Sequence, residues 1–245
     1  MKKGRVFIGT SGYSYAHWGD GLFYPEGLRE NKWLEYYSKF FNTVELNVTF
    51  YRLPRRSTFE NWYKKTPKDF VFVVKGSRYI THVKKLNGIN DDLLKLFNLL
   101  KELKEKLGIV LWQFPPDMKL DIKRLEKFCK DISGYKIRYA FEFRHSSWFN
   151  EEVYTLLRNY NFSLCIAHSP FWPMVEIVTS DFIYLRFHGG KTLYGSEYTE
   201  KELKFWVDKA KIWIEKGIDL YAYFNNDACG YAVKNAIRLK DLLTI

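Results

Sequence analysis

Cysteine is scarce in this chain and poorly spaced for chemistry. The 245 residues include three cysteines, Cys129, Cys165 and Cys229, which lie far apart. This odd number, without the short spacings of zinc or redox motifs, argues against a disulfide framework, a structural zinc site and a thiol redox centre. Cys165 stands between two aliphatic residues and is predicted to be an inert buried thiol. We therefore expect a reducing, cytoplasmic environment.

Long apolar runs and flexible linkers are missing as well. No apolar stretch approaches the ~18 residues that a membrane span needs. Lys2, Lys3 and Arg5 lead directly into a short predicted strand rather than into the apolar segment of a signal peptide, so we expect no membrane association. No Pro/Gly-rich or low-complexity segment divides the chain, which predicts one domain over residues 1–245. Glutamine occurs once, at Gln113, whereas lysine is abundant, a bias that favours a thermophilic source.

Acidic residues are fewer than basic residues. Lys and Arg number 39 against 28 Asp and Glu, giving a net charge of +11. Such an excess raises the local concentration of anions, so nucleic acid and small anionic metabolites are the partners it favours. An equally simple interpretation is a solvated lysine-rich surface, because Lys101, Lys104, Lys201 and Lys204 lie on predicted outer helices.

Signatures of several enzyme classes are absent. The sequence shows no nucleophile elbow, no phosphate-binding P-loop and no Ser, His and Asp in the order of a known triad. The segment Gly9-Thr10-Ser11-Gly12 lacks the glycine spacing of a dinucleotide-binding fold. These absences argue against nucleotide-cofactor chemistry.

What the chain does contain is a recurrent pattern of short apolar runs, each of which ends in polar or charged residues. Buried parallel strands read as near-continuous apolar runs, and a (β/α)8 barrel carries its site at their C-terminal ends. We therefore predict an α/β fold, a single-domain (β/α)8 TIM barrel with its site at those ends. The eight runs are Val6–Ser11, Val44–Asn47, Phe72–Lys75, Val110–Gln113, Ala140–His145, Leu164–His168, Tyr184–His188 and Tyr223–Asp227.

Segments with helical spacing separate these runs. Ser57 with Glu60 and Thr199 with Glu202 have the spacing of a capping box, and Asn90 and Asn150 precede acidic first turns. Two connections are irregular: residues 13–30 are rich in glycine and aromatics, and residues 168–181 lack a convincing helix. We expect both to lie over the mouth of the barrel as binding loops.

The polar residues of the strand tips form the candidate site. Side chains alternate faces along a strand, so if Val44 and Leu46 pack against helices, Glu45 and Asn47 point into the barrel. The same rule places residues of both charges inside. We predict Glu45, Glu142, His188 and Asp227 as catalytic residues and, as ligand-binding residues, Lys75, Gln113, Arg144, Arg186, Asn47, Asn225, Tyr13, Trp18, Tyr51 and Trp148.

This set of residues admits several chemistries. An ion-pair network could simply close the top of the barrel, since buried charges persist when they are paired or functionally required. Two glutamates on separate strands could act as acid and base in glycoside hydrolysis. Histidines with carboxylates could bind a divalent metal for phosphodiester cleavage, although no spacing identifies the metal. Arg144, Arg186 and Lys75 could hold a phosphate or carboxylate.

The strand tips and their flanking residues also resemble the YecE-like family, a family of TIM-barrel proteins of unknown function. The matching segments span nearly the whole chain in order: residues 9–18, Phe23-Tyr24-Pro25, 41–54, 141–149, Arg186-Phe187-His188-Gly189 and 223–232. The chain departs from the family pattern at Tyr13, Ser146 and His168, where Trp, Pro and an acidic residue are usual. The resemblance implies the barrel fold, and it suggests a relationship to metal-dependent nucleases of the endonuclease IV class.

Three functional hypotheses follow. The first is a hydrolase-like barrel that binds an anionic, phosphate-bearing ligand, with nucleic acid among the candidates and a divalent metal as a candidate cofactor. The second is a carbohydrate-active enzyme that uses Glu45 and Glu142. The third is a module that binds nucleic acid or another anion without turnover.

Overall fold

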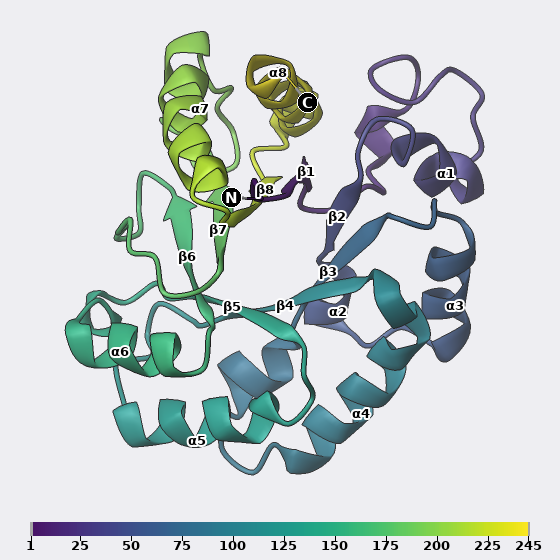
Figure 1. Cartoon of the computed structure of the whole chain (residues 1–245). Helices are drawn as coiled ribbons and strands as arrows, with labels where there is room; N and C mark the ends of the chain where they lie inside the picture. The colour runs from purple at the N-terminus through teal and green to yellow at the C-terminus, as the bar shows by residue number, and fades with distance from the viewer. Residues whose placement is uncertain (1, 245) are drawn as a thin grey trace.

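The computed structural model describes residues 2–244 and confirms the predicted barrel. Eight parallel strands lie at the centre of the molecule and the helices surround them (Figure 1). Every predicted apolar run overlaps a strand, although the run Tyr223–Asp227 shares only its first two residues with β8. The strands are β1 (Val6–Thr10), β2 (Thr43–Leu46), β3 (Val71–Lys75), β4 (Leu107–Gln113), β5 (Arg138–Glu142), β6 (Ser163–His168), β7 (Phe182–Phe187) and β8 (Asp219–Phe224).

Helices follow seven of the eight strands, and the connection between β6 and β7 has none, as its sequence predicts. No helix within residues 2–244 is both long enough and apolar enough to cross a membrane. The α-helices are α1 (Trp33–Tyr37), α2 (Val48–Tyr51), α3 (Arg56–Lys64), α4 (Asn90–Leu100), α5 (Ile122–Ser133), α6 (Glu151–Asn159), α7 (Glu200–Glu215) and α8 (Tyr231–Leu243). Short turns of other helix types are η1 (Ala16–Trp18), η2 (Glu30–Lys32), η3 (Tyr79–Val83), η4 (Lys101–Lys106), η5 (Ser146–Trp148) and η6 (Ala228–Gly230).

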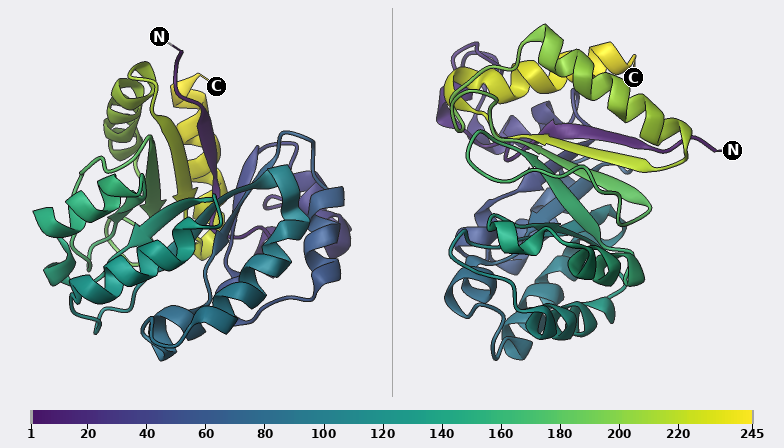
Figure 2. Two further views of the ribbon diagram at one scale, coloured as in Figure 1. Left: turned by 60° about the horizontal axis from the view of Figure 1, so that its bottom comes forward. Right: turned by 90° about the vertical axis from the view of Figure 1, so that its left-hand side faces the viewer.

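The strand order brings the two ends of the chain together. β1 pairs with β8 in parallel, and Figure 2 shows these two strands side by side beneath α7 and α8. The sheet runs β1-β8-β7-β6-β5-β4-β3-β2, so that the barrel would close between β1 and β2.

A tyrosine hydroxyl joins β1 to β2 where no backbone ladder is found in the described residues. Tyr37 Oη accepts a hydrogen bond from Thr10 N at 3.0 Å and donates to Thr43 O at 3.1 Å. Gly9 permits the close approach of the two strands, because a Cβ there would lie 2.4 Å from Thr43 O. The barrel is therefore nearly closed, with a side chain bridging its seam.

Two apolar clusters fill the molecule, as strand alternation requires. The outer cluster packs strands against helices and includes Val44, Leu46 and Phe141. The inner cluster fills the barrel, and its members are Phe7, Val73, Ile109, Leu111, Ala140, Cys165, Ala167, Phe182, Tyr184, Tyr221 and Tyr223. Cys165 is a buried thiol, as predicted, and burial raises its pKa well above the ordinary value.

Ion pairs close the N-terminal end of the barrel. Asp219 Oδ2 lies 2.8 Å from Arg5 Nη2 and 2.7 Å from Arg138 Nη1. Polar groups at this end of a TIM barrel serve stability, whereas those at the opposite end form active sites.

Of the four predicted helix starts, two are confirmed and two are wrong. Thr199 and Glu202 form the expected capping box, and Asn150 Oδ1 accepts from Val153 N at 3.1 Å. The Ser57 capping box is wrong, because α3 begins at Arg56 and Ser57 lies inside the helix. Asn90 is likewise the first helical residue rather than the cap.

Candidate functional site

Arg186 is the centre of a buried charge cluster at the C-terminal end of the barrel. It lies on the inner face of β7, is 1% exposed, and contacts carboxylates from two other strands. Its Nη2 donates to Glu45 Oε1 at 2.7 Å, and its Nη1 donates to Glu142 Oε2. Tyr184, two residues earlier on β7, donates its hydroxyl to Glu45 Oε2 at 2.6 Å. The predicted inward positions of Glu45, Glu142 and Arg186 are thus confirmed.

Arg144 completes the pairing of Glu142. Its Nε donates to Glu142 Oε1 at 2.9 Å. Burial is the largest single influence and favours a higher pKa for both glutamates. The charge of Arg186 together with Tyr184 at Glu45, and together with Arg144 at Glu142, outweighs it. The pKa of Glu45 is lowered and that of Glu142 falls well below its ordinary value. Both carboxylates are therefore ionised at neutral pH.

His188 lies beside this cluster and is fully buried. Asn225 Nδ2 lies 3.1 Å from His188 Nδ1, and because an amide NH2 only donates, Nδ1 is the acceptor. Nε2 then carries the proton, 3.7 Å from Glu142 Oε2, which is too long for a hydrogen bond. Burial and then the charge of Arg186 lower the pKa of His188 to about 4, so the ring is neutral.

Lys75 ends β3 and stands apart from the ion pairs. Its side chain is buried, with 8% of the residue's surface exposed, and Nζ lies 4.0 Å above the centroid of the Phe50 ring. Within residues 2–244, Nζ has no hydrogen-bond or ion-pair partner. Burial, followed by the positive charge of Arg186, lowers its pKa to about 7, even though Glu142 and Glu45 oppose the shift.

Gln113 ends β4 next to this group. It is buried, and its Nε2 lies 3.4 Å from His82 Nε2, a residue of η3. Burial and then Lys75 lower the pKa of His82 to about 4. Phe50 and His82 contribute to the site but were not predicted, because they lie in the short helical segments α2 and η3 beyond the strand tips, where strand alternation no longer defines a face.

The irregular β6–β7 connection covers the site, as predicted for a binding loop. The ring centroid of Trp172 lies 3.7 Å from Arg144 Cζ and 5.3 Å from the His188 ring. A guanidinium stacked on an indole keeps its edge available for hydrogen bonds. Among the described residues, Arg144 Nη1 and Nη2 have no partner.

An aromatic cleft lies at the ends of β1 and β2. Its volume is about 490 Å³, and the residues that line it include Tyr13, Tyr15, Tyr51 and Trp62. Asn47 Nδ2 donates to Ser11 O at 3.1 Å, while Asn47 Oδ1 and Ser11 Oγ are buried without a partner in the part of the chain described. The predicted ligand-binding residues Tyr13, Tyr51 and Asn47 therefore meet in one cleft.

Three of the predicted site residues, two tryptophans and one aspartate, lie outside the cleft and the charge cluster. Trp18 is buried and donates to Asp227 Oδ1 at 2.8 Å. Trp148 is buried, stacks on Phe143 and donates to Met118 O at 2.6 Å. Both indoles are packed on all sides, so we omit them from the candidate site. Burial raises the pKa of Asp227 to about 6, and Asp227 fastens the loop after β1 to the end of β8.

The structure does not bring the predicted metal-ligating types into one group. Among residues 2–244, no cluster of three or more His, Cys, Asp or Glu is arranged to hold a metal ion. Glu45 and Glu142 have arginine partners instead.

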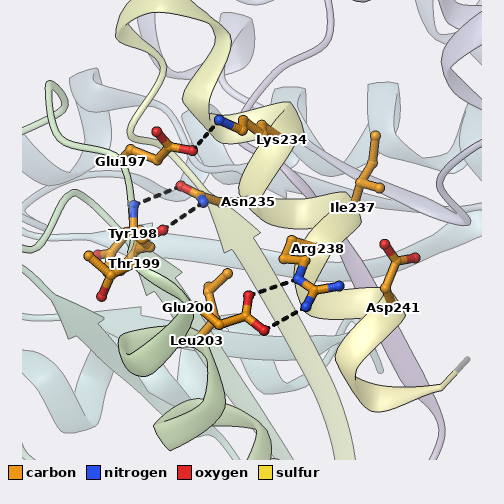
Figure 3. Close-up of a pocket in the computed structure, with 10 residues that line it drawn as sticks. All are labelled: Glu197, Tyr198, Thr199, Glu200, Leu203, Lys234, Asn235, Ile237, Arg238 and Asp241. Atoms are coloured by element: carbon orange, nitrogen blue, oxygen red, sulfur yellow. Dashed lines mark hydrogen bonds and ion pairs between the residues drawn. The ribbon is translucent and has the colours of Figure 1, made fainter.

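A second depression lies on the outer surface, between α7 and α8, with a volume of about 520 Å³ (Figure 3). Its polar side chains contact one another: Arg238 Nε donates to Glu200 Oε2 at 2.8 Å, and Lys234 Nζ lies 2.6 Å from Glu197 Oε1. Asn235 accepts from Tyr198 N at 3.0 Å. These bonds join α8 to α7 and to the segment that precedes α7, so we place the candidate site at the barrel mouth.

Comparisons with known proteins agree with the fold and the motifs. The family described as "Protein of unknown function DUF72" matches residues 7–245. The chain is 28% identical to the UPF0759 protein YunF of Bacillus subtilis, over 98% of this chain and 95% of that protein. It is 30% identical to the UPF0759 protein YecE of Escherichia coli, over 62% of this chain and 54% of that protein.

Solved structures show the same relationship. A DUF72 family protein from Thermotoga maritima superposes with a TM-score of 0.87 at 33% identity, covering 98% of this chain and 100% of that one. A D-psicose 3-epimerase superposes with a TM-score of 0.52 at 9% identity, covering 99% of each chain, which is a likeness of fold alone. The resemblance to YecE-like proteins is thereby confirmed, and the chain belongs to the DUF72 family of TIM-barrel proteins.

Proposed function

We propose that the protein binds a small anionic ligand, one that carries a phosphate or a carboxylate, at the mouth of its barrel. The observation that carries this proposal is that the Arg144 guanidinium is held in place while two of its nitrogens lack partners among residues 2–244. One edge of its guanidinium is fixed by Glu142 and one face by Trp172, while Nη1 and Nη2 have no partner among residues 2–244. A rigidly held guanidinium with two unpaired amino groups suits the paired oxygens of a phosphate or carboxylate.

The surrounding charge supports an anion. The cluster contains Arg144, Arg186 and Lys75 against Glu45 and Glu142, so it carries one positive charge in excess when Lys75 is protonated. A negative ligand would compensate that excess in a site of low dielectric, where such compensation is worth more than in water.

The aromatic cleft extends the proposal to the rest of the ligand. Flat rings such as Tyr13 and Tyr51 stack on sugars or bases, and the unpartnered Asn47 Oδ1 can accept a hydrogen bond from a hydroxyl or amino group. Asn47 lines the cleft and lies two residues after Glu45 of the charged cluster, so the cleft adjoins that cluster. A phosphorylated sugar or nucleoside fits both features.

The geometry gives less support to glycoside hydrolysis by two glutamates. That reaction needs one carboxyl group that is protonated near neutral pH. Glu45 and Glu142 are both held ionised by Arg186, which suits them to position the arginines. Hydrolysis of a phosphate ester stays a proposal, and a ligand recovered chemically unchanged would favour a binding module without turnover.

Calorimetric titration tests the anion site. Inorganic phosphate, ribose 5-phosphate and adenosine 5′-monophosphate are titrated into the wild-type protein, Arg144→Met and Arg158→Met, with ribose as the uncharged probe. Arg158 is an exposed arginine on α6 and provides the matched control. We expect Arg144→Met to weaken the phosphorylated probes by about ten- to hundredfold, the loss of a charge-assisted hydrogen bond, and Arg158→Met to have no effect. Equal affinities in all three proteins, or binding of ribose alone, would overturn the proposal.

A further inference from the structure

Lys75 is a buried amine that the ion-pair network does not need. Each carboxylate oxygen in the cluster already has a partner: Arg186 and Tyr184 bond to Glu45, while Arg144 and Arg186 bond to Glu142. Lys75 Nζ instead lies against the face of Phe50, at the C-terminal tip of β3. Most of the Lys75 side chain is buried, and within residues 2–244 no ion pair offsets the cost of removing its charge from water, so a structural role alone does not explain it.

The surroundings of Lys75 favour the neutral amine. The charged and titratable groups that face it come from four elements or their ends: Arg186 on β7, Glu142 and Arg144 at the end of β5, Glu45 on β2 and His82 on η3. Burial and Arg186 together lower its pKa to about 7. About half of the molecules then hold an unprotonated amine at pH 7, a fraction about a thousandfold greater than for an ordinary surface lysine.

We propose that Lys75 is a nucleophile that forms an imine with a carbonyl group of the ligand, an inference that rests on the anion site proposed above. The Nζ lone pair attacks the carbonyl carbon, and a proton passes from nitrogen to oxygen to give a carbinolamine. Loss of that oxygen as water, with the second amine hydrogen, leaves a C=N bond between Lys75 and the ligand. Desolvated lysines at low pKa are the nucleophiles of such reactions.

This role narrows the class of ligand. The anionic group would lie against Arg144 and the carbonyl carbon against Lys75, so the ligand is an oxo acid or a phosphorylated aldose or ketose in its open form. An imine withdraws electrons from the adjacent carbon, and the reactions it assists are proton removal or carbon–carbon cleavage at that carbon. The unpartnered edge of Arg144 and the nucleophile then belong to one site.

Reductive trapping tests the imine directly. The wild-type protein is incubated at about pH 7 with glyoxylate, a small anionic aldehyde, and cyanoborohydride, and the modified lysines are identified by peptide mass spectrometry over time. Lys123, exposed on α5, is the internal control. We expect Lys75 to become carboxymethylated at least about tenfold faster than Lys123, since about half of the Lys75 amines are unprotonated at this pH. The rate at Lys75 should rise through about pH 7 and then level off.

Two further experiments distinguish a failure of the imine inference from a failure of the anion-site proposal. Arg144→Met should slow the reaction of Lys75 with glyoxylate but leave its reaction with the uncharged glycolaldehyde unchanged. If Lys75 reacts equally fast with both aldehydes and the Arg144→Met substitution does not change its rate, the amine is nucleophilic and the anion site is wrong. If phosphate binding depends on Arg144 while Lys75 reacts no faster than Lys123, the anion site stands and the imine inference is overturned.

Discussion

At the scale of single residues, Arg186 compensates the charges of two buried carboxylates at the barrel mouth. Removing one partner of a buried ion pair leaves an uncompensated charge, which costs about 3–5 kcal/mol. Arg186→Met keeps the volume of the stem but leaves both Glu45 and Glu142 without their shared partner. We expect urea unfolding to show a loss of stability of at least about that size.

The control for this prediction is Arg158→Met. Arg158 pairs with Glu151 on the surface of α6, where an exposed pair contributes about 0–1 kcal/mol. A variant that combines Arg186→Met with Glu45→Gln and Glu142→Gln should recover part of the lost stability. If Arg186→Met cost no more than Arg158→Met, the charge cluster would not be the buried network described above.

Lys75 makes a separate prediction about pH. Its pKa is lowered to about 7 in the folded protein, whereas an unfolded lysine titrates near 10.4. Below pH 7 both states hold the proton, and burial of the charge costs stability. Between these values the unfolded chain binds a proton that the folded protein lacks, so the free energy of unfolding rises with pH, by up to about 1.4 kcal/mol per unit.

Urea unfolding of the wild type and of Lys75→Met, compared between about pH 6 and pH 10, measures this contribution. Methionine retains the apolar stem without the charge. We expect Lys75→Met to be the more stable protein at the acid end, and the difference to shrink as the pH rises. A difference that stays constant across the range would mean that Lys75 titrates as an ordinary surface lysine.

Residue positions were predictable where strand alternation applies and less so beyond it. Glu45, Glu142 and Arg186 were placed inside the barrel because a two-residue period fixes the face of each side chain. Their partners were not predictable, since pairing depends on strand register and on distances across the barrel. Trp18 and Trp148 were misplaced because a position just after a strand does not define whether a ring faces the mouth or the helices.

At the scale of elements, the seam between β1 and β2 is the weakest closure of the barrel. Tyr37→Phe removes the hydroxyl that joins Thr10 N to Thr43 O and leaves a buried amide without its acceptor. We expect a loss of about 1–3 kcal/mol, together with faster hydrogen exchange at the Thr10 amide. Tyr36→Phe is the neighbouring control, because the Tyr36 hydroxyl has no hydrogen bond among residues 2–244. Equal effects of the two variants would show that the seam does not depend on Tyr37.

Helix caps test how far a local motif predicts an element. Thr199 and Ser57 both begin a capping-box pattern, but only the Thr199 box forms. Thr199→Ala should therefore cost about 1 kcal/mol, and Ser57→Ala less than about 0.5 kcal/mol, by chemical denaturation. Comparable losses would mean that Ser57 caps α3 in solution. The motif alone could not distinguish the two cases, since α3 begins earlier than its pattern indicates.

At the scale of the whole molecule, the barrel was predictable because eight buried strands each leave the same apolar signature. The inner and outer clusters follow from the same alternation. The seam bridged by Tyr37 could not be predicted, and neither could the cleft lined by Tyr13, Tyr51 and Trp62. Each of them joins side chains from segments whose relative placement only the folded chain defines.

The net charge of +11 is also a property of the whole molecule, and the structure separates it from the candidate site. Lys201 and Lys211 are exposed on α7, whereas the Arg144 side chain is 12% exposed and stacked on Trp172. We expect a nucleic acid duplex to contact these exposed lysines rather than the largely buried Arg144. Affinity that arises from such contacts falls steeply with salt, with a slope of about −0.9 per phosphate neutralised.

Fluorescent single-stranded and duplex oligonucleotides, titrated across a salt series, distinguish these two surfaces. We expect the double variant Lys201→Gln/Lys211→Gln to reduce the salt slope measured with the duplex by up to about 2, and Arg144→Met to leave it unchanged. The opposite pattern, a loss of oligonucleotide binding in Arg144→Met alone, would place nucleic acid at the barrel mouth. The ligand of the anion site would then be a polynucleotide rather than a small molecule.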